Sequence, residues 1–326
     1  MTTVLMILDQ GKTTMKTIHM AGIEQPVSAI VIGLMRIMDR SDEQIRELVD
    51  AGLSRGVTML DTADVYGPTD HSAEQRLGDA LNWSSSQREK VLLQTKCGIV
   101  RENGPYFDFS AERILSAVEG SLKALRTDYI DVLLLHRPDA LMEPAEIAGA
   151  FDKLHAQGKV RHFGVSNHTV GQIELLKTAV RQPLVANQVQ LSITHAPIIA
   201  QGVAMNMQAL PQSVERAAGL VDYCRLHQIT LQAWSPYQAG FFTGSFIGDR
   251  HNYKELNDVL DRLAEKYAVP PIAIATAWIT RHPANMQVVT GTTNPQRIAG
   301  ACAGADITLS REEWYELYRA ADYLVP

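Results

Sequence analysis

Four side chains with acid–base chemistry stand at or near the ends of short apolar runs. Asp61, Lys96 and His136 each come directly after such a run, and Tyr66 follows Asp61 by five residues. A tyrosine hydroxyl has an ordinary pKa of about 10, which is too high for ready proton transfer near neutrality. A nearby ammonium such as Lys96 lowers this pKa because it favours the phenolate, and Asp61 would hold the ammonium in place. Side chains of these four types, placed close together, would suit a site that donates a proton.

Each of these residues, taken alone, also has an ordinary structural explanation. An Asp after a strand is often only a turn or helix cap, and a Lys at a strand end usually extends to water. A lone His or Tyr is more often a hydrogen-bonding or packing residue. A catalytic role requires that the side chains converge on one pocket, so the elements that carry them decide the question.

The chain alternates between short apolar runs and longer amphipathic stretches. The runs are mostly apolar at successive positions, as expected of parallel strands that are covered on both faces. The predicted strands are residues 29–34, 57–60, 91–95, 130–135, 161–165, 184–189, 230–233 and 287–290. Helical patterns include residues 42–54, 73–82, 111–125, 144–157, 170–178, 214–227 and 253–267. Helix starts are marked by the capping boxes Ser41/Gln44 and Ser310/Glu313 and by Pro144 and Pro295.

Eight strands that alternate with helices fit either a closed barrel or an open doubly wound sheet. The sequence contains no G-x-G triplet, so the Rossmann G-x-G-x-x-G is absent. We therefore predict an α/β fold, a (β/α)₈ TIM barrel. Residues 16–326 would form a single barrel domain after an N-terminal extension at residues 1–15. The ends of successive strands meet at the C-terminal face of such a barrel, where active sites are built.

The composition narrows the class of protein. Of the 326 residues, 46% are apolar and 20% charged, as in ordinary globular proteins. The net charge of −6 provides no basic surface, so we expect no nucleic-acid partner. Three widely separated cysteines predict neither a disulfide framework nor a zinc site and fit a reducing, cytoplasmic location. No apolar run approaches the roughly 20 residues that span a bilayer, so we expect no membrane association.

The motifs together resemble those of the aldo-keto reductases. The segment Asp61-Thr-Ala-Asp-x-Tyr66-Gly, with Lys96 and His136 at later strand ends, resembles the Asp–Tyr–Lys–His tetrad of that family. The resemblance runs from about residue 17 to residue 323, and the stretch from Leu135 to Asp139 resembles its bacterial branch of broad aldehyde and ketone reductases. It implies that Tyr66 protonates a carbonyl oxygen, that His136 orients the carbonyl and that a nicotinamide supplies hydride.

The same resemblance implies where the cofactor NADPH (NADP⁺) would bind. Ser166, Asn167 and Gln188 match residues that bond the nicotinamide carboxamide, and Trp234 matches the aromatic on which the nicotinamide ring stacks. Other matches lie in the loop under the nicotinamide ribose (Gly33, Met35, Arg36), the pyrophosphate loop (Ser235, Pro236, Tyr237) and the segment for the adenosine 2′-phosphate (Gly291, Thr292, Thr293, Arg297). For the last segment we expect that free N–H groups at a helix start and the Arg297 guanidinium bind the phosphate.

Three positions depart from the family pattern. Many members have Lys where Gly291 stands, and Glu and Asn where Gly300 and Ala301 stand. Each lost charge-assisted contact would cost on the order of 1.5–3 kcal/mol of cofactor binding. The preference for NADPH over NADH then depends largely on Arg297.

Other functions stay open at this stage. One alternative is an NAD-dependent dehydrogenase of a sugar or alcohol, and another is a nucleotide-sensing regulatory subunit resembling the β subunits of potassium channels. A metal hydrolase would need more His and carboxylate ligands at strand ends than His136 and Asp61. We expect a small-molecule carbonyl substrate, whose identity depends on loops at residues 101–109, 192–212 and 241–252. The sequence determines neither the conformations of those loops nor the oligomeric state.

Overall fold

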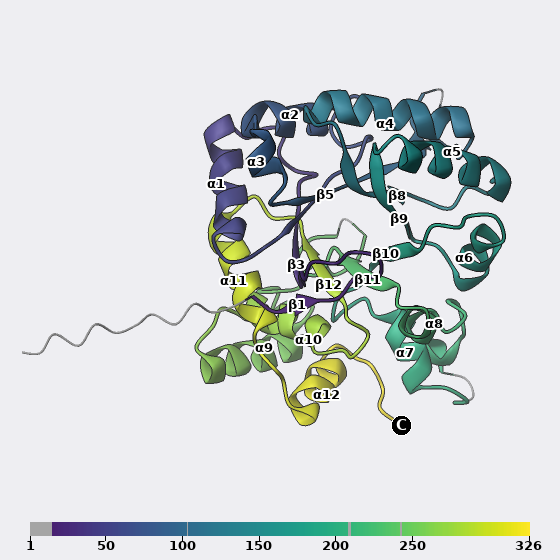
Figure 1. Ribbon diagram of the computed structural model, residues 1–326. Helices are drawn as coiled ribbons and strands as arrows, with labels where there is room; N and C mark the ends of the chain where they lie inside the picture. Colours follow the sequence, from purple (N-terminus) through teal and green to yellow (C-terminus); the bar gives the residue numbers. More distant parts are fainter. Residues whose placement is uncertain (1–14, 103, 208–209, 242) are drawn as a thin grey trace, which may run out of the picture.

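Eight parallel strands form a closed barrel at the centre of the chain (Figure 1). The computed structural model describes residues 15–102, 104–207, 210–241 and 243–326. Around the barrel the strands run in the order β10-β11-β12-β3-β4-β5-β8-β9. They are β3 (Ile30–Gly33), β4 (Met59–Asp61), β5 (Leu92–Cys97), β8 (Ile130–Leu135), β9 (Val160–Ser166), β10 (Leu184–Gln190), β11 (Thr230–Trp234) and β12 (Gln287–Thr290). The TIM-barrel prediction is confirmed, and each predicted strand ends within two residues of the observed one.

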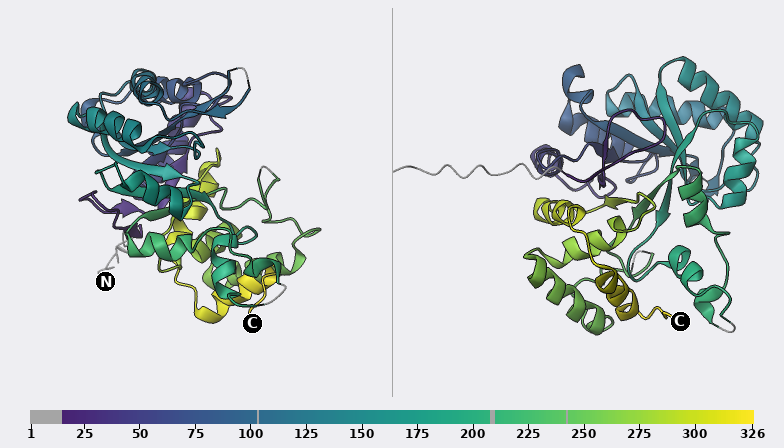
Figure 2. Two further views of the ribbon diagram at one scale, coloured as in Figure 1. Left: turned by 90° about the vertical axis from the view of Figure 1, so that its right-hand side faces the viewer. Right: turned by 60° about the horizontal axis from the view of Figure 1, so that its bottom comes forward.

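Helices cover the outside of the barrel. Figures 1 and 2 show the early helices (blue to teal) and the late helices (green to yellow) on opposite sides of it. The helices are α1 (Asp42–Leu53), α2 (Ser72–Leu81), α3 (Ser85–Arg88), α4 (Ala111–Leu125), α5 (Pro144–Ala156), α6 (Val170–Lys177), α7 (Pro197–Val203), α8 (Leu220–Leu226), α9 (Lys254–Tyr267), α10 (Pro271–Thr280), α11 (Pro295–Ala305) and α12 (Arg311–Ala320), with a 3₁₀ turn at Pro211–Ser213. In the described part of the chain, none of these helices is both long and apolar enough to cross a lipid bilayer.

Two helices differ from the sequence prediction. Helix α8 begins at Leu220 rather than at residue 214, because Gly219 has a left-handed backbone (φ 67°) that interrupts the helix. Helix α10 was not among the amphipathic patterns. Its residues from Ala273 to Thr280 are all buried, and a helix that is apolar on all sides has no periodic signal.

The N-terminal end of the barrel is closed by a small hairpin. Strands β1 (Thr17–Ile18) and β2 (Val27–Ser28) pair antiparallel just before β3. The Gln287 amide donates to the Ser28 carbonyl, which joins this hairpin to β12. The predicted N-terminal extension lies outside the described residues except for Met15, which is buried beside Gly56.

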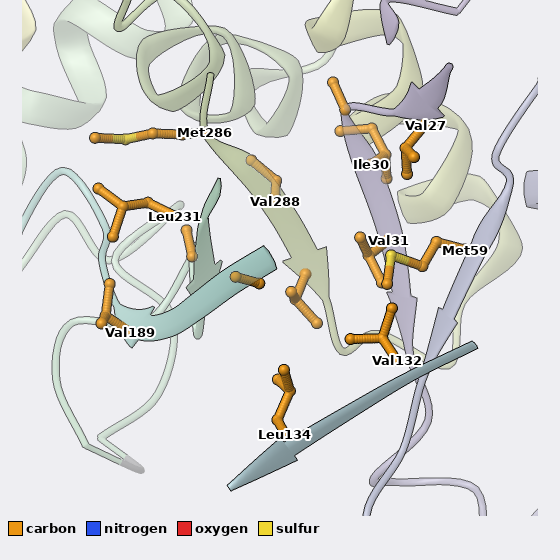
Figure 3. Packing of buried hydrophobic residues seen from close by; sticks show 14 of the residues in the cluster. Val27, Ile30, Val31, Met59, Val132, Leu134, Val189, Leu231, Met286 and Val288 are labelled. Carbon is orange, nitrogen blue, oxygen red and sulfur yellow. The ribbon is translucent and has the colours of Figure 1, made fainter. Parts of the chain in front are cut away.

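The alternation of side chains along each strand decides which residues face the barrel interior. Val31 of β3 and Met59 of the neighbouring strand β4 lie close together among the buried residues (Figure 3). Because the strand period is two, the side chain of Asp61 points the same way as that of Met59. The same rule places Lys96 above Gln94 on β5, and His136 above Leu134 at the end of β8. The barrel therefore brings three strand ends to one mouth.

The close contact between α2 and α4 generates a stability prediction. A Cβ atom added at Gly78 would lie 2.3 Å from the backbone oxygen of Ala124, which cannot move without shifting α4. We expect Gly78→Ala to lower the free energy of unfolding by roughly 1–3 kcal/mol, as overpacked cores do, measured by urea denaturation. The control is Gly149→Ala in α5, where nothing lies within 4 Å of the added atom. That variant should be about 0.4–1 kcal/mol more stable than the wild type, and equal losses in both variants would contradict the steric argument.

Candidate active site

The Lys96 ammonium is the centre of a buried polar cluster at the barrel mouth. Its Nζ donates to Asp61 Oδ2 at 2.7 Å, to the Thr62 carbonyl at 2.8 Å and to the Tyr66 hydroxyl oxygen at 3.2 Å. Lys96 is fully buried and Asp61 is 2% exposed. An ammonium has three hydrogens to donate and no acceptor. All three are used, so the position of Lys96 is fixed by its partners.

Tyr66 lies at the open side of this cluster. Because its oxygen accepts a hydrogen from Lys96, its own hydroxyl hydrogen is left to be donated elsewhere. Burial raises the pKa of Tyr66 above its ordinary value, although the Lys96 ammonium offsets part of that rise. From the sequence we expected Lys96 to lower this pKa, but in the structure the effect of desolvation on it is larger. Tyr66 is therefore protonated near neutrality.

His136 completes the group of four. Its ring lies edge-on to that of Tyr66, with ring centroids 5.7 Å apart and an interplanar angle of 80°. Burial holds the pKa of His136 well below its ordinary value, and the positive charges of Lys96 and Arg137 lower it further. The imidazole is therefore neutral, with one N–H to donate. Its Nδ1 has no hydrogen-bond partner within the described residues.

Glutamine side chains inside the barrel support Asp61 from below. Gln94 and Gln188 each donate through Nε2 to Asp61 Oδ1, at 2.6 and 3.0 Å. Both also donate to Gln232 Oε1, and Gln232 donates in turn to Gln287 Oε1 at 2.9 Å. Of these four glutamines, only Gln188 was predicted from the sequence to be a site residue. The available signal for the others was one buried glutamine in each of three mostly buried strands, β5, β11 and β12.

The loop that carries Tyr66 is held by its backbone. The Tyr66 carbonyl accepts from the Ala73 amide at the start of α2, and the Asp64 amide donates to the Lys96 carbonyl at the end of β5. The His71 amide donates to the Asp64 carbonyl. These bonds connect the loop to both neighbouring elements, so Tyr66 is placed by the barrel and by α2 together.

A second cluster of charged groups lies behind this loop. Glu74, fully buried on α2, accepts from His71, Ser121 and Thr95. Asp64 is also fully buried, and neither of its carboxylate oxygens has a hydrogen-bond partner among the described residues. Its nearest cation is Arg113, at 3.8 Å. Burial and the neighbouring charge of Glu74 raise the pKa of Asp64 to about 7, although Arg113 partly opposes them.

Comparison with known proteins identifies the family of this chain. The model of the Aldo/keto reductase family matches residues 29–322, which include all eight barrel strands. The chain belongs to the aldo/keto reductase family. Members use a nicotinamide cofactor in carbonyl chemistry, so the chain is an oxidoreductase of that general type.

Relatives match over nearly the whole chain. A 6-dehydroglucose reductase of Agrobacterium fabrum is 34% identical over 306 residues, which cover 90% of this chain and 94% of that protein. The oxidoreductase YdhF of Escherichia coli is 33% identical, with 92% and 95% covered. The crystal structure of an aldo/keto reductase from Klebsiella pneumoniae, in complex with NADP and acetate, is similar with a TM-score of 0.72 and 26% identity, covering 96% of this chain and 97% of that one.

The residues predicted to hold the nicotinamide lie together at the mouth of this aldo/keto reductase. Asn167, just after β9, donates to the Ser166 hydroxyl at 2.8 Å and to the His136 carbonyl at 3.3 Å. Its Oδ1 accepts from the Trp234 indole at 3.0 Å. Gln188 uses its Nε2 on Asp61 and Gln232, which leaves its carbonyl oxygen as an acceptor. A carboxamide with an N–H₂ donor fits this set of acceptors.

The predicted pyrophosphate loop turns away from the barrel directly after β11. Ser235 has a left-handed backbone (φ 52°), and its hydroxyl donates to Gln238 Oε1 at 2.8 Å. Pro236 is buried, whereas the Tyr237 hydroxyl lies 2.8 Å from Thr276 Oγ1 on α10. The Tyr237 hydroxyl is therefore tied to the helix layer, and the Ser235 side chain stays at the rim.

The loop after β3 contacts the loop after β12, because these two strands are neighbours in the barrel. The Arg36 guanidinium donates to the Gly291 carbonyl at 3.2 Å, and a Cβ at Gly33 would lie 3.1 Å from a Val289 methyl group. Met35 is half-buried beside them. The predicted ribose loop and phosphate segment are thus one continuous surface.

The start of α11 differs from the sequence expectation. Asn294 Oδ1 already accepts from the Gln296 and Arg297 amides, and Thr292 Oγ1 accepts from the Asn294 amide. These N–H groups are not free for a phosphate, as we had expected them to be. The Arg297 side chain, which is exposed and has no ion-pair partner in the described chain, stays available for a phosphate, and Thr293 in the same segment is half-buried.

Packing explains two of the departures from the family pattern. A Cβ at Gly300 would lie 2.6 Å from Ile272 Cγ2 and 3.0 Å from Pro270 Cγ, and Ala301 is fully buried. Gly300 thus packs against Ile272 of α10 and against Pro270 just before that helix. A larger side chain at Gly300 would require these two side chains to shift, and an asparagine at the fully buried Ala301 would need a polar partner there.

The buried carboxyl of Asp64 generates a prediction about stability and pH. Its pKa is about 7 in the folded chain, against about 3.9 in an unfolded one. Between these values the folded state binds the proton more tightly, so the wild type loses stability as the pH rises. Because asparagine does not titrate, we expect the melting temperature of Asp64→Asn to exceed that of the wild type by more at pH 8 than at pH 5, measured by circular dichroism.

Asp152→Asn is the control for this pH experiment. Hydrogen bonds from Gln182 and Arg181 hold the pKa of the partly exposed Asp152 below its ordinary value. It is therefore ionised in both states at pH 5 and at pH 8, and the difference from wild type should not change between them. A constant difference for Asp64→Asn would mean that the folded Asp64 is already ionised at pH 5.

Proposed function

We propose that the protein reduces aldehydes or ketones to alcohols with NADPH, and that Tyr66 is the proton donor. The observation that carries this proposal is the bond from Lys96 Nζ to the Tyr66 oxygen. It directs the tyrosine hydrogen away from the lysine, toward the open mouth. Family membership supports carbonyl reduction as the general chemistry.

Each of the four clustered residues has a separate role in the proposed reaction. When bound, the reduced nicotinamide supplies the hydride that the carbonyl carbon accepts. Tyr66 then gives its proton to the carbonyl oxygen, and the Lys96 ammonium stabilises the phenolate that is left. The neutral His136 donates its N–H to the same carbonyl oxygen as negative charge develops there. Asp61 keeps Lys96 charged and in position.

The choice of NADPH rests on Arg297 and on a relative. Arg297 is the free cation of the predicted 2′-phosphate segment, and guanidinium groups suit phosphates. The similar structure from Klebsiella pneumoniae is described in complex with NADP. The capped α11 start and the small residues at Gly291, Gly300 and Ala301 favour the alternative of an NAD-dependent dehydrogenase. An Escherichia coli relative, 27% identical, is named an NADH-specific methylglyoxal reductase.

Tyr66→Phe tests the proton donor. We expect kcat for carbonyl reduction to fall by roughly 10²–10⁴-fold, the usual contribution of a general acid, while NADPH still binds. NADPH oxidation with a panel of aldehydes and ketones, and calorimetric titration of NADPH, measure the two quantities. The matched control is Tyr129→Phe, whose hydroxyl is buried without a partner among the described residues. If Tyr66→Phe turns over as fast as Tyr129→Phe, another group donates the proton.

Arg297→Ala tests the cofactor site. Loss of a charge-assisted contact of about 1.5–3 kcal/mol should lower kcat/KM for NADPH by roughly 10- to 150-fold and leave that for NADH unchanged. Steady-state rates with each cofactor give the ratio. Arg319→Ala removes another exposed arginine without an ion pair in the described chain, from α12, and should change neither value. If the ratio of kcat/KM for NADPH to that for NADH is unaltered in Arg297→Ala, the phosphate binds at another site.

A further inference from the structure

Asp64 lies in the loop between β4 and α2 (residues 62–71, here called the Tyr66 loop), but the reaction proposed above does not use it. In the described part of the chain it is the one buried carboxylate whose oxygens both lack a hydrogen-bond partner. Its backbone is held, because the Asp64 amide donates to the Lys96 carbonyl and the Asp64 carbonyl accepts from the His71 amide. An ionised carboxylate without a partner is unfavourable in such a place.

The group that faces this carboxylate is the guanidinium of Arg113, on α4. Arg113 Nη2 lies 3.8 Å from Asp64 Oδ2, which is too far for a hydrogen bond. The same nitrogen makes only long contacts of 3.4 Å, with Asp70 Oδ2 and with the Ile99 carbonyl. Arg113 Nε is buried and has no partner among the described residues. A donor and an acceptor that both lack a bond thus face each other across a gap about 1 Å wider than a charge-assisted hydrogen bond.

The other titratable groups around Asp64 are already paired or neutral. Glu74 of α2 accepts three hydrogen bonds, one of them from His71. Although burial opposes it, this bond to Glu74 raises the pKa of His71 above its ordinary value, which favours a charged pair. Asp70 is exposed and contacts an arginine through each of its oxygens. Burial raises the pKa of the Cys97 thiol at the end of β5 well above its ordinary value. Asp64 is therefore the acid of this cluster that still needs a partner.

The proton of Asp64 is held only loosely near neutrality. Burial and the charge of Glu74 raise the pKa of Asp64 to about 7, although Arg113 partly opposes them. A neutral carboxyl below this pH tolerates the gap to Arg113. Above it, the carboxylate is charged and buried, so that a direct bond to the facing guanidinium becomes favourable.

The charge of Asp64 also acts on Tyr66. Burial is the main cause of the raised pKa of Tyr66, and the negative charges of Asp61 and Asp64 add to it in spite of Lys96. A general acid with a higher pKa gives up its proton less readily in the transition state. Loss of the Asp64 proton should therefore slow proton donation by Tyr66.

We propose that Asp64 and Arg113 form a latch behind the Tyr66 loop, open while Asp64 holds its proton and closed as a hydrogen-bonded ion pair once that proton has passed to water. Closing the latch makes Tyr66 a weaker acid, so that carbonyl reduction slows as the pH rises. The closing concerns the folded chain alone. The effect on reduction rests on the proposed function, because it acts through the proposed proton donor.

The Nε–H group of Arg113 reports on the latch without any substrate. In the ¹⁵N-labelled protein its resonance is assigned by its disappearance in Arg113→Lys. We expect this resonance to shift downfield between pH 6 and pH 8, with a midpoint of about 7, because a charged acceptor then binds the guanidinium. In Asp64→Asn it should stay at the position that it has in the wild type at pH 6.

Rates of NADPH oxidation test the effect on Tyr66. The quantity is kcat of the wild type divided by kcat of Asp64→Asn, with the aldehyde or ketone that the wild type reduces fastest. This ratio cancels every titration that the two proteins share. We expect it to fall by about threefold or more from pH 6 to pH 8.5. The matched control is Asp79→Asn on α2, a partly exposed carboxylate bound by Gln75 and Arg126, and its ratio should stay constant.

The remaining outcomes overturn the inference in distinguishable ways. If the Arg113 resonance does not move, the pair stays open at every pH. If it moves equally in Asp64→Asn, another group of the cluster titrates, and the latch is likewise wrong. A moving resonance with a constant rate ratio means that the latch closes without an effect on Tyr66. If the wild type reduces no carbonyl compound with either cofactor, the proposed function fails, and the Arg113 resonance still decides whether the latch exists.

Discussion

The buried ion pair between Lys96 and Asp61 is the interaction on which the rest of the site depends. Two charges removed from water are tolerated only when their remaining hydrogens and lone pairs are satisfied. Lys96 therefore needs Thr62 and Tyr66 as well as Asp61, and Asp61 needs the glutamine amides below it. The pair holds the pKa of Lys96 above its ordinary value in spite of burial. A permanent ammonium beside Tyr66 is the result.

Much of this arrangement follows from the sequence, because parallel strands have a strong signal. Runs that are apolar at successive positions predicted all eight barrel strands, and one end of a barrel collects every strand terminus. Asp61, Lys96 and His136 could therefore be placed in one pocket without knowledge of any long-range contact. Tyr66 could be placed only approximately, since its loop is positioned by bonds to β5 and α2 that no local pattern encodes.

What the sequence did not reveal are interactions between residues far apart in the chain. One example is the set of glutamines Gln94, Gln232 and Gln287, which are important because they pair across the barrel interior. Gln94 and Gln232 are 138 positions apart in the chain. The net rise of the Tyr66 pKa has the same origin, because desolvation depends on everything that packs around a group. The close packing at Gly300 likewise required α10, a helix without a periodic pattern.

The glutamine layer also limits how protons can move. Amide side chains hold their neighbours by hydrogen bonds, but they neither take up nor release protons near neutrality. No relay can therefore run from Tyr66 down through these side chains to the opposite end of the barrel. In the reaction that we propose, the proton that Tyr66 would give up therefore does not return by way of this layer. Return of a proton to Tyr66 and exchange of the alcohol would then both take place on the side of the glutamine layer where the Tyr66 hydroxyl lies.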